Sequence, residues 1–563
     1  MATLRELRWD IEKQLHLLVG ELKHQVLYGV AEFCQKEGGE ALPSVAATEV
    51  DLYDFIVDFL RGEHLQSLED EGMSCLLTLR DLIDELNAPE KELPSAVEED
   101  PETVTAKSPS ASTPTSAKVQ GLEKHYKEVL NVSCADFHTM GLKPITFFRQ
   151  VLATCFYPSL LNDESLPLDA RQRAERILRN CDGGSIGSYT PISGIKEIQA
   201  SICKYITKRD GVIPDPDNIY ITSGSQMSLI MVLKLLIQSE GSLKTGVLTP
   251  VPSHSAFNMA VAAQGGLVVP YYLCEEQGWA VQIEEICRAL HMARGRCNPT
   301  VLYVINPGSP TGHVQSKDSI AEVIRFAAEE KLFLMVDEVH QDNVYGKGIE
   351  FYSYRRVLSE IGLPYSSSVE LASFNSVSKS VMGECGLRGG YLEFVNLDPL
   401  VIPHIYTFFC TIPCGPLSGQ IALDVMIDPP QPTQPSYELY TQEIQFIRRT
   451  ISNNAQKTLD VLSCLPGISC QPVNGGNFAF PRLHLSQSAI KHAKEKQLEP
   501  DLLYCLHLLE DEGLRVGAGC EHGQKDGTYH IRICLAVPEE IMKAVLQRLK
   551  SFHLRFIKEF PLS

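Results

Sequence analysis

The sequence predicts an α/β protein, with a mostly parallel sheet and crossover helices, preceded by a small all-helical module. Three observations support this prediction. Near the amino terminus apolar residues recur at helical spacing, whereas from about Gln120 onward short apolar runs alternate with longer helical stretches. A stretch rich in Pro, Ser, Thr and Glu separates the two regions. At 563 residues the chain is long enough to bury several cores.

Residues 1–88 form the predicted helical module. One helix face is indicated by apolar residues three or four positions apart, namely Leu4, Leu7, Ile11, Leu15, Leu18, Leu22, Val26 and Val30. Shorter runs of the same kind span Asp51 to Leu60 and Leu76 to Leu86, with glycines between them. A core face accounts for these runs. The module is also a candidate surface for a protein partner, although no residue in it indicates chemistry.

Residues 89–119 are predicted to be a disordered linker. They read PEKELPSAVEEDPETVTAKSPSASTPTSAKV, in which Pro, Ser, Thr and Glu predominate. Such a composition offers too little apolar surface to offset the entropy lost on folding. The linker therefore separates the module from a catalytic region that spans residues 120–563.

The predicted sheet is built from five short apolar runs in that region. These runs are Asn218 to Ile221, Thr245 to Leu248, Thr300 to Ile305, Leu332 to Val336 and Glu370 to Phe374. In open α/β sheets, ligands bind beyond the carboxyl ends of the strands. Gly224, Asn306, Asp337 and Ser376 stand at or just after four of these ends. We therefore expect them to face one site.

Composition excludes several classes of function. The formal net charge of −20 is spread along the chain, which argues against a nucleic-acid surface, and no apolar run approaches a membrane span of roughly 20 residues. Seventeen cysteines lack paired C-x-x-C spacing, so neither a disulfide framework nor a metal site is indicated, with Cys410 and Cys414 the nearest approach. Acidic residues near the start fit neither a secretory signal nor a mitochondrial presequence. A cytoplasmic protein is expected.

The most informative segment is Ser376 to Tyr391, which reads SVSKSVMGECGLRGGY. Lys379 follows two serines, and Arg388 comes nine positions later. A lysine in this setting can form a Schiff base with an aldehyde cofactor, while Ser376, Ser378 and the guanidinium hold that cofactor's phosphate. Pyridoxal phosphate is the candidate cofactor. A surface lysine after a serine-rich turn is the alternative interpretation of the motif alone.

Asp337 strengthens the case for this cofactor. The sequence VDEV places its carboxylate at the end of an apolar strand, where a charge is costly without a cationic partner. A protonated pyridine nitrogen would be such a partner, and it would keep the ring an electron sink. Capping of the following turn is the alternative role for this residue.

A phosphate site is predicted where a strand gives way to a helix in ITSGSQMSLIMVLKLL. Gly224, Ser225 and Gln226 can offer backbone amides at the helix start. Two further residues are candidates for substrate binding. Asn306 opens the turn NPGSPTG, 31 residues before Asp337, although turn chemistry alone explains that composition. Arg532, in GTYHIRICLA, can hold a carboxylate, and a surface strand arginine is an equal alternative.

Residues 120 to 560 resemble the alanine aminotransferases, which belong to the fold-type I family of enzymes that use pyridoxal phosphate. The resemblance rests on LKPITFFRQVLATC, RAERIL, YVINPGSPTGHVQS, VIRFAAEEKLFLMVDEVHQDNVY, VSKSVMGECGLRGGYLEFVNLD and DGTYHIRICLA, in the family's order. It implies a large domain of about residues 195–425 with a mixed seven-stranded sheet. It also implies a smaller α/β domain made of residues 120–194 and 426–563, and a homodimer with shared active sites.

The resemblance assigns roles to five residues. Lys379 corresponds to the Schiff-base lysine, and Asp337 corresponds to the partner of the pyridine nitrogen. Arg388 matches the phosphate arginine, and Arg532 the arginine that binds the α-carboxylate. Tyr189, in GSYTPISG, matches the tyrosine that reaches the phosphate bound by the partner subunit.

Three positions around the expected cofactor ring depart from the family. Ser309 stands where the family has the second asparagine of NPGNPTG, and His340 stands where it has the tyrosine of DEVY. His254, within PSHS, replaces a tyrosine that stacks on the ring. In the family the asparagine and the tyrosine both hydrogen-bond the phenolic oxygen of the cofactor. Serine is too short to do so, whereas an imidazole can still donate one hydrogen bond or stack.

The expected activity is transfer of an amino group from L-alanine to 2-oxoglutarate, which gives pyruvate and L-glutamate. Amino acids and 2-oxo acids are the expected substrates. The three substitutions keep an alternative open, namely a pseudoenzyme that binds pyridoxal phosphate and uses residues 1–88 for interaction. A lyase is a third alternative, because the same cofactor supports several reactions.

Overall fold

The computed structural model describes Ile56, Tyr126, residues 128–238 and residues 243–562. The predicted linker, and the predicted helical module apart from Ile56, lie outside these described residues. From Tyr126 onward the described chain belongs to one compact unit, Pro109–Ser563.

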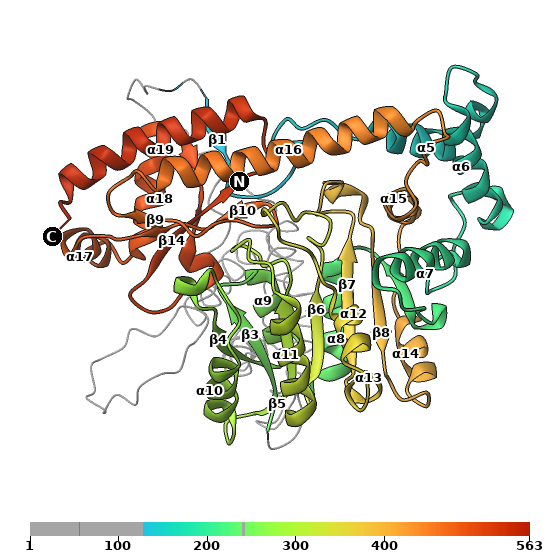
Figure 1. Cartoon of the computed structure of the whole chain (residues 1–563), viewed down its shortest axis with the longest axis horizontal. Helices are drawn as coiled ribbons and strands as arrows, with labels where there is room; N and C mark the ends of the chain where they lie inside the picture. Colours follow the sequence, from blue (N-terminus) through green and yellow to red (C-terminus); the bar gives the residue numbers. More distant parts are fainter. Residues whose placement is uncertain (1–55, 57–125, 127, 239–242, 563) are drawn as a thin grey trace, which may run out of the picture. The chain divides into compact units, whose positions relative to one another are not determined.

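A seven-stranded sheet forms the centre of this unit, in the order β2-β8-β7-β6-β5-β3-β4 (Figure 1). Its strands are β2 (Ile219–Thr222), β3 (Thr245–Val251), β4 (Leu267–Tyr272), β5 (Asn298–Ile305), β6 (Phe333–Asp337), β7 (Leu371–Ser376) and β8 (Gly390–Val395). Only β8 runs antiparallel to its neighbours. The mostly parallel sheet expected from the sequence is confirmed, and all five predicted strands belong to it.

The strands are apolar throughout because both faces of the sheet are covered. Alternate side chains of β6 enter different cores: Leu334 and Val336 pack on one side, and Met335 packs on the other. The first core also receives α10 (Ile283–Ala293), α11 (Lys317–Glu330) and α12 (Tyr354–Ile361), and the second receives α8 (Ser225–Leu236), α9 (Ser255–Ala263) and α14 (Ile402–Phe409). Each large apolar side chain buried in this way contributes roughly 1.5–3 kcal/mol.

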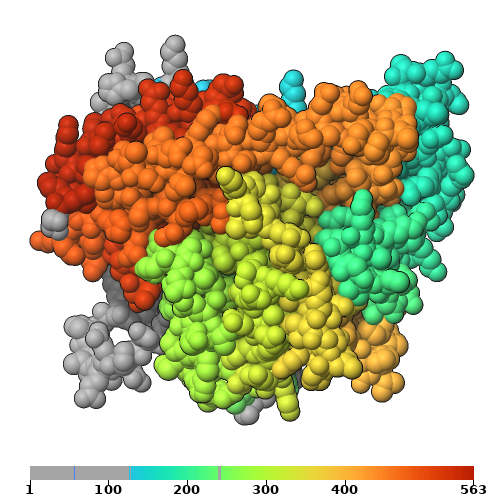
Figure 2. All heavy atoms as spheres, viewed as in Figure 1, coloured from blue at the N-terminus to red at the C-terminus, as the bar shows by residue number. Residues whose placement is uncertain are grey.

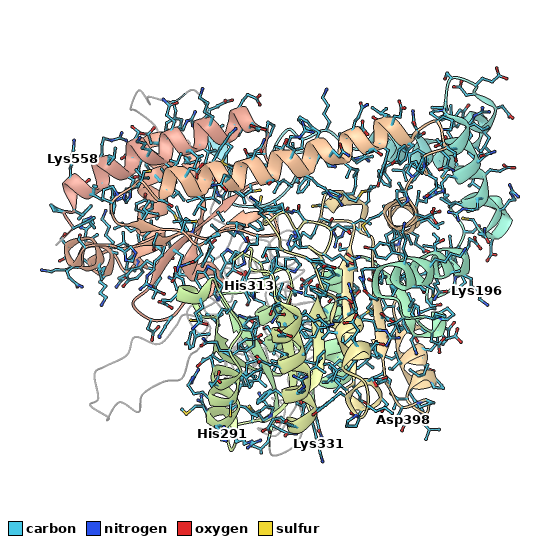
Figure 3. The ribbon with its side chains drawn as sticks, viewed as in Figure 1. Lys196, His291, His313, Lys331, Asp398 and Lys558 are labelled. Carbon is cyan, nitrogen blue, oxygen red and sulfur yellow. The ribbon has the colours of Figure 1, made fainter. Side chains whose placement is uncertain are left out.

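The carboxyl ends of the strands meet at one edge of this sheet. Because β8 runs antiparallel between β2 and β7, its first residue, Gly390, pairs with both Thr222 and Ser376. The segment just before β8 therefore lies beside the carboxyl ends of both β2 and β7. Figure 3 shows His313 near this edge, whereas Lys331 and Asp398 lie at the opposite edge.

A second, smaller sheet lies beyond these strand ends. Its central strand, β14 (Tyr529–Cys534), pairs with β10 (Phe478–Ala479), β11 (Arg482–Leu483) and β13 (Gly517–Ala518), and β9 (Ile468–Ser469) pairs with β11. The long helices α16 (Tyr437–Leu462) and α19 (Glu539–Glu559) pack together beside it, with α17 (Gln487–Glu495) and α18 (Pro500–Glu512). In Figure 2 these carboxyl-terminal segments, in orange and red, cover the end of the larger sheet.

Further helices and a short pair of strands complete the described part of this unit. The other helices are α5 (Thr146–Phe156), α6 (Leu168–Arg179), α7 (Lys196–Asp210), α13 (Tyr365–Ser368) and α15 (Leu417–Ile427). The short strand β1 (Leu130–Asn131) pairs in parallel with β12 (Leu514–Arg515), which joins the start of the described chain to its carboxyl-terminal part. The domain boundaries expected from the sequence stay predictions. No helix in the described part of the chain is long and apolar enough to span a membrane.

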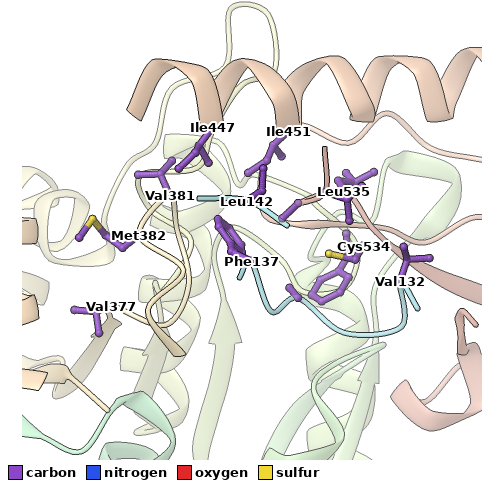
Figure 4. Packing of buried hydrophobic residues seen from close by; sticks show 14 of the residues in the cluster. Val132, Phe137, Leu142, Val377, Val381, Met382, Ile447, Ile451, Cys534 and Leu535 are labelled. Carbon is purple, nitrogen blue, oxygen red and sulfur yellow. The ribbon is translucent and has the colours of Figure 1, made fainter. Parts of the chain in front are cut away.

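The segment that we call the strap, residues 132–142, packs against the loop after β7 (Figure 4). Phe137 and Leu142 share a core with Val381 and Met382 of that loop. Gly383 allows the contact, because a Cβ atom there would lie 2.4 Å from the Phe137 ring, and its φ of +62° also favours glycine. The strap thereby buttresses the loop that carries Lys379.

Candidate active site

Lys379 lies in the loop that follows β7, and buried serines shape this loop. The Ser378 amide donates to Ser376 Oγ at 3.1 Å, and that hydroxyl donates to the Gly389 carbonyl at 3.2 Å. Both serines are buried, whereas the Lys379 side chain is half-buried. The turn therefore projects the amine from the carboxyl edge of the sheet.

Asp337 ends β6, next to β7 in the sheet. The Tyr303 hydroxyl donates to Asp337 Oδ2 at 2.9 Å, and the Val339 amide donates to Oδ1 at 3.3 Å. Burial raises the pKa of Asp337, while these two hydrogen bonds and the positive charge of Lys379 oppose that rise. Lys379 and Asp337 are thus within electrostatic reach of each other, and the carboxylate has no cation in contact with it.

The predicted phosphate site lies where β2 gives way to α8. Gly224, with φ of +95°, precedes the helix, and a Cβ atom there would lie 2.9 Å from Arg388 Nη2. The exposed Arg388 side chain donates to the Ser223 carbonyl at 3.1 Å, to Ser378 Oγ at 3.4 Å and to the Cys385 carbonyl at 2.7 Å. All three acceptors are uncharged, so these bonds leave its charge available to a ligand. A helix start and a guanidinium together favour a phosphate.

Ser225 and Gln226, which follow Gly224 at this helix start, are partly accessible to solvent. Ser225 is half-buried at the first position of α8, and its amide is one of the unsatisfied donors of a helix start. Gln226 is also half-buried, and its Nε2 donates to the Ala256 carbonyl at 3.5 Å. The predicted glycine, serines and arginine therefore gather at one place, while the Gln226 side chain is engaged elsewhere.

Two imidazoles lie close to Lys379. His254 Nδ1 accepts a hydrogen bond from the Ala256 amide at 3.2 Å and so caps α9. Protein surrounds most of the ring, although solvent reaches part of it. Burial and the charges of Lys379 and Arg532 lower the pKa of His254 to about 4. His340 is 1% exposed, and its Nδ1 is buried without a partner. Burial, Lys379 and His254 lower its pKa to about 3. Both rings are therefore neutral at physiological pH.

Arg532 belongs to β14 and lies within electrostatic reach of His254. Its Nη2 donates to the Ser133 carbonyl of the strap, and its guanidinium lies 4.5 Å from the centre of the Phe478 ring. Its Nε is buried without a partner. Burial lowers the pKa of Arg532, although it remains a cation at neutral pH. A partly desolvated guanidinium that makes no ion pair within the described residues is suited to a carboxylate.

Three predicted residues are placed differently. Asn306 is fully buried, and both ends of its carboxamide are hydrogen-bonded. Its Oδ1 accepts from the Gln315 amide at 3.0 Å, and its Nδ2 donates to the Tyr352 carbonyl at 3.3 Å. The structure therefore does not bring its side chain into the site. Tyr189 is 85% exposed, which leaves its ring open to another molecule. Ser309 is half-buried in the turn after β5.

Two residues near the site were missed by the sequence analysis. Tyr303 supports Asp337 and stacks on Phe257, with ring centres 3.6 Å apart. A tyrosine within the apolar run VLYVI is indistinguishable from core by pattern alone. His522 is buried and lies within electrostatic reach of Arg532 and His254. No signal in the sequence indicates its position.

Comparison with known proteins identifies the family. The family model "Aminotransferase class I and II" matches residues 152–549. Alanine aminotransferase 2 of Xenopus laevis is 46% identical over 442 residues, which cover 78% of this chain and 82% of that protein. Alanine aminotransferase 1 of Homo sapiens is 45% identical over 442 residues, which cover 78% and 89% of the two chains.

Solved structures show the same fold. An alanine aminotransferase from Pyrococcus furiosus superposes with a TM-score of 0.60 at 19% identity, covering 76% of this chain and 93% of that one. An aminotransferase from Escherichia coli gives a TM-score of 0.59 at 17% identity, covering 76% and 91%. The fold-type I architecture expected from the sequence is therefore confirmed. Together with the relatives of about 46% identity, this shows that the chain belongs to the class I and II aminotransferase family.

Proposed function

We propose that this protein is a pyridoxal phosphate-dependent aminotransferase that converts L-alanine and 2-oxoglutarate into pyruvate and L-glutamate. The observation that carries the proposal is the convergence of an amine and a buried carboxylate at neighbouring strand ends, Lys379 and Asp337. Arg532 adds a cation for the carboxylate that both substrates share. The alanine aminotransferase relatives support the choice of substrates.

The residues present fit pyridoxal phosphate. The phosphate would bind between the amides of residues 224–226, the two serines of the lysine motif and Arg388, where a Cβ atom at Gly224 would crowd the guanidinium. Asp337 would face the ring nitrogen, and the buried, unpartnered Nδ1 of His340 is a further polar atom close to Lys379. When bound, this group supplies an aldehyde carbon that carries the amino group and a ring that accepts an electron pair from the substrate.

Each of three side chains then has a defined task. Arg532 binds the substrate carboxylate with its guanidinium and so fixes the α-carbon near Lys379. Lys379 Nζ would accept the α-proton of the substrate and return it to the carbon that carries the amino group. Asp337 would hold the protonated ring nitrogen of the bound cofactor, and that positive charge would offset the cost of burying the carboxylate alone.

The first test is direct. The purified full-length protein, loaded with pyridoxal phosphate, is expected to show visible absorbance that changes when L-alanine is added. With 2-oxoglutarate present, pyruvate should then accumulate, and coupled oxidation of NADH by lactate dehydrogenase measures it. Omitting 2-oxoglutarate is the control, because only one equivalent of pyruvate per site should then form. Full cofactor binding without any pyruvate would reject the proposed reaction.

That negative outcome would favour a second candidate, a binding protein that retains the cofactor without transfer. Ser309, His340 and His254 support this candidate, because all three differ from the family around the expected ring. Amino-acid-dependent release of ammonia would instead indicate a lyase. Product analysis separates the three possibilities in one experiment.

Restoring the family residues is expected to raise the rate. The double variant Ser309→Asn and His340→Tyr would return the amide donor that serine is too short to supply, and would replace the imidazole with the tyrosine of the family. Hydrogen bonds to charged groups contribute about 1.5–3 kcal/mol each, so the one returned bond is expected to raise kcat by roughly ten- to a hundredfold. The pH titration of the visible band of the loaded protein checks the change independently of turnover. An unchanged titration curve and rate would contradict the assignment of these two positions.

The assembly and location are also proposals. We infer a homodimer, which the 85% exposure of Tyr189 supports, and sedimentation equilibrium tests it. Cytoplasmic location is supported by the described cysteines, all of which are free thiols, and fractionation of cells tests it. Residues 1–88 remain a candidate site for a protein partner. Neither nucleic acid nor a membrane is proposed as a partner.

A further inference from the structure

Two hydrogen bonds connect the larger sheet to the smaller one beside the site. The Ser253 amide donates to the His522 carbonyl at 2.9 Å, and His522 Nδ1 lies 3.3 Å from the Ser253 carbonyl. Ser253 directly precedes His254, whereas His522 ends the short helix η7 (Gly519–His522), which leads into β14 and Arg532. Gly523 permits the approach, since a Cβ atom there would already lie 3.3 Å from Val251. We call this reciprocal pair the latch.

The latch fixes the tautomer of His522. A carbonyl oxygen only accepts hydrogen bonds, so Nδ1 must carry the hydrogen. Nε2 is then an acceptor, and it is buried without a partner. The ring is 5% exposed and lies edge-on to Phe480, with centres 6.2 Å apart. His522 is therefore held as a neutral ring whose single hydrogen bond spans the two sheets.

The charges around the ring also oppose its protonation. Burial, Arg532 and His254 lower the pKa of His522 well below 6.5, and the hydrogen bond to Ser253 opposes this only in part. Arg532 faces the ring from β14, and His254 faces it from the start of α9. A proton on Nε2 would add a buried charge beside a guanidinium and have no acceptor.

We propose that His522 is a positioning residue of the substrate site, which fastens the loop ending in His254 to the segment that leads into Arg532. This inference rests on the proposed function only in taking the site around Arg532 to receive carboxylates. The latch sets the spacing between His254 at the start of α9 and Arg532 in β14. Its contribution is to substrate affinity and to orientation, rather than to a chemical step.

The pH dependence of the latch follows from the neutral ring. The pKa of His522 is lowered in the latched state. The latch therefore stays intact while the pH is above the ordinary histidine pKa of about 6.5. As the pH falls below that value, the unlatched state gains a proton and becomes favoured. Affinity for a carboxylate should therefore decline from about pH 6.5 downward. His254 titrates in the same direction, so the contribution of His522 is the difference between the wild type and a variant at that position.

Two variants separate the hydrogen bond from packing. His522→Asn keeps a side-chain N–H donor but lacks the ring, whereas His522→Phe keeps the ring against Phe480 but lacks the donor. The probe is glutarate, a dicarboxylate that cannot undergo transfer, and calorimetry measures its binding to the full chain loaded with pyridoxal phosphate. We expect His522→Asn to bind within about threefold of the wild type and His522→Phe to bind about tenfold more weakly. The acid decline should be smaller in His522→Asn.

Thermal unfolding of each variant shows whether it folds, and only variants with an intact transition are compared. The proposal is overturned if His522→Phe binds glutarate as well as His522→Asn does, or if the wild type does not bind glutarate. An unchanged acid decline in His522→Asn would remove the role of its protonation. Because glutarate binding needs no turnover, absence of pyruvate formation would reject the proposed function and leave this inference standing.

Discussion

Replacing Lys379 with alanine is expected to abolish pyruvate formation from L-alanine, with a fall in kcat of at least about ten-thousandfold. The half-buried amine is the side chain that the loop after β7 presents to the site. Without it, nothing at that position can bond the cofactor aldehyde or move the α-proton. The same variant should lack the visible band that requires the lysine. Absorbance and pyruvate assays on one preparation measure both effects.

A matched control is Lys196→Ala, on the exposed surface of α7 (Figure 3). It removes the same side chain far from the strand ends and should leave the spectrum and the rate unchanged. Added methylamine should restore a small part of the rate to Lys379→Ala, because a free amine can occupy the vacated volume. Full activity in Lys379→Ala would remove the basis of the proposed reaction.

Replacing Asp337 with asparagine is expected to lower kcat by a hundred- to a thousandfold, the second-largest effect. Removing one partner of a buried charge pair costs about 3–5 kcal/mol, because the ring nitrogen would then lose the anion that keeps it protonated. The unloaded protein should respond in the opposite way. Burial already raises the pKa of this carboxyl, so a neutral amide should leave thermal stability unchanged or increase it. Initial rates and calorimetric unfolding measure the two effects.

Tyr303→Phe is the control for the environment of that carboxylate. It removes only the hydrogen bond to Oδ2, at 2.9 Å, and keeps the stack on Phe257. A fall of roughly ten- to a hundredfold is expected, since one hydrogen bond to a charged carboxylate contributes about 1.5–3 kcal/mol. If Asp337→Asn and Tyr303→Phe had equal effects, the carboxylate would matter only through its hydrogen bonds and not through its charge.

Much of the fold follows from the sequence because buried parallel strands are apolar on both faces. Runs such as Leu332 to Val336 carry that signal without help from distant residues, and the observed β6 differs from it by one residue at each end. The strands β4 and β8 were missed; for β8, GYLEFV shares its first two residues with the glycine-rich lysine motif and includes a buried glutamate, Glu393. Its antiparallel direction depends on pairing with β2 and β7, which local pattern does not encode.

The site was less predictable where it depends on distant contacts. Lys379 and Asp337 occur in short motifs with a recognisable chemical purpose. By contrast, His522 is hydrogen-bonded to Ser253, which is 269 positions away, and the sequence around either residue does not indicate this contact. The role of Asn306 stays a prediction, and its carboxamide is bonded by the Gln315 amide and by the carbonyl of Tyr352, which is 46 positions away.

The strap contributes to the site although it precedes the region that the family model matches. The family model starts at residue 152, yet Ser133 holds the guanidinium of Arg532, and Phe137 fills the space over Gly383. A protein truncated at residue 152 would keep Lys379, Asp337 and Arg532. It would lose Phe137, which packs against the loop that carries Lys379, and Ser133, whose carbonyl accepts a hydrogen bond from Arg532. The minimal catalytic fragment must therefore include the residues ahead of α5.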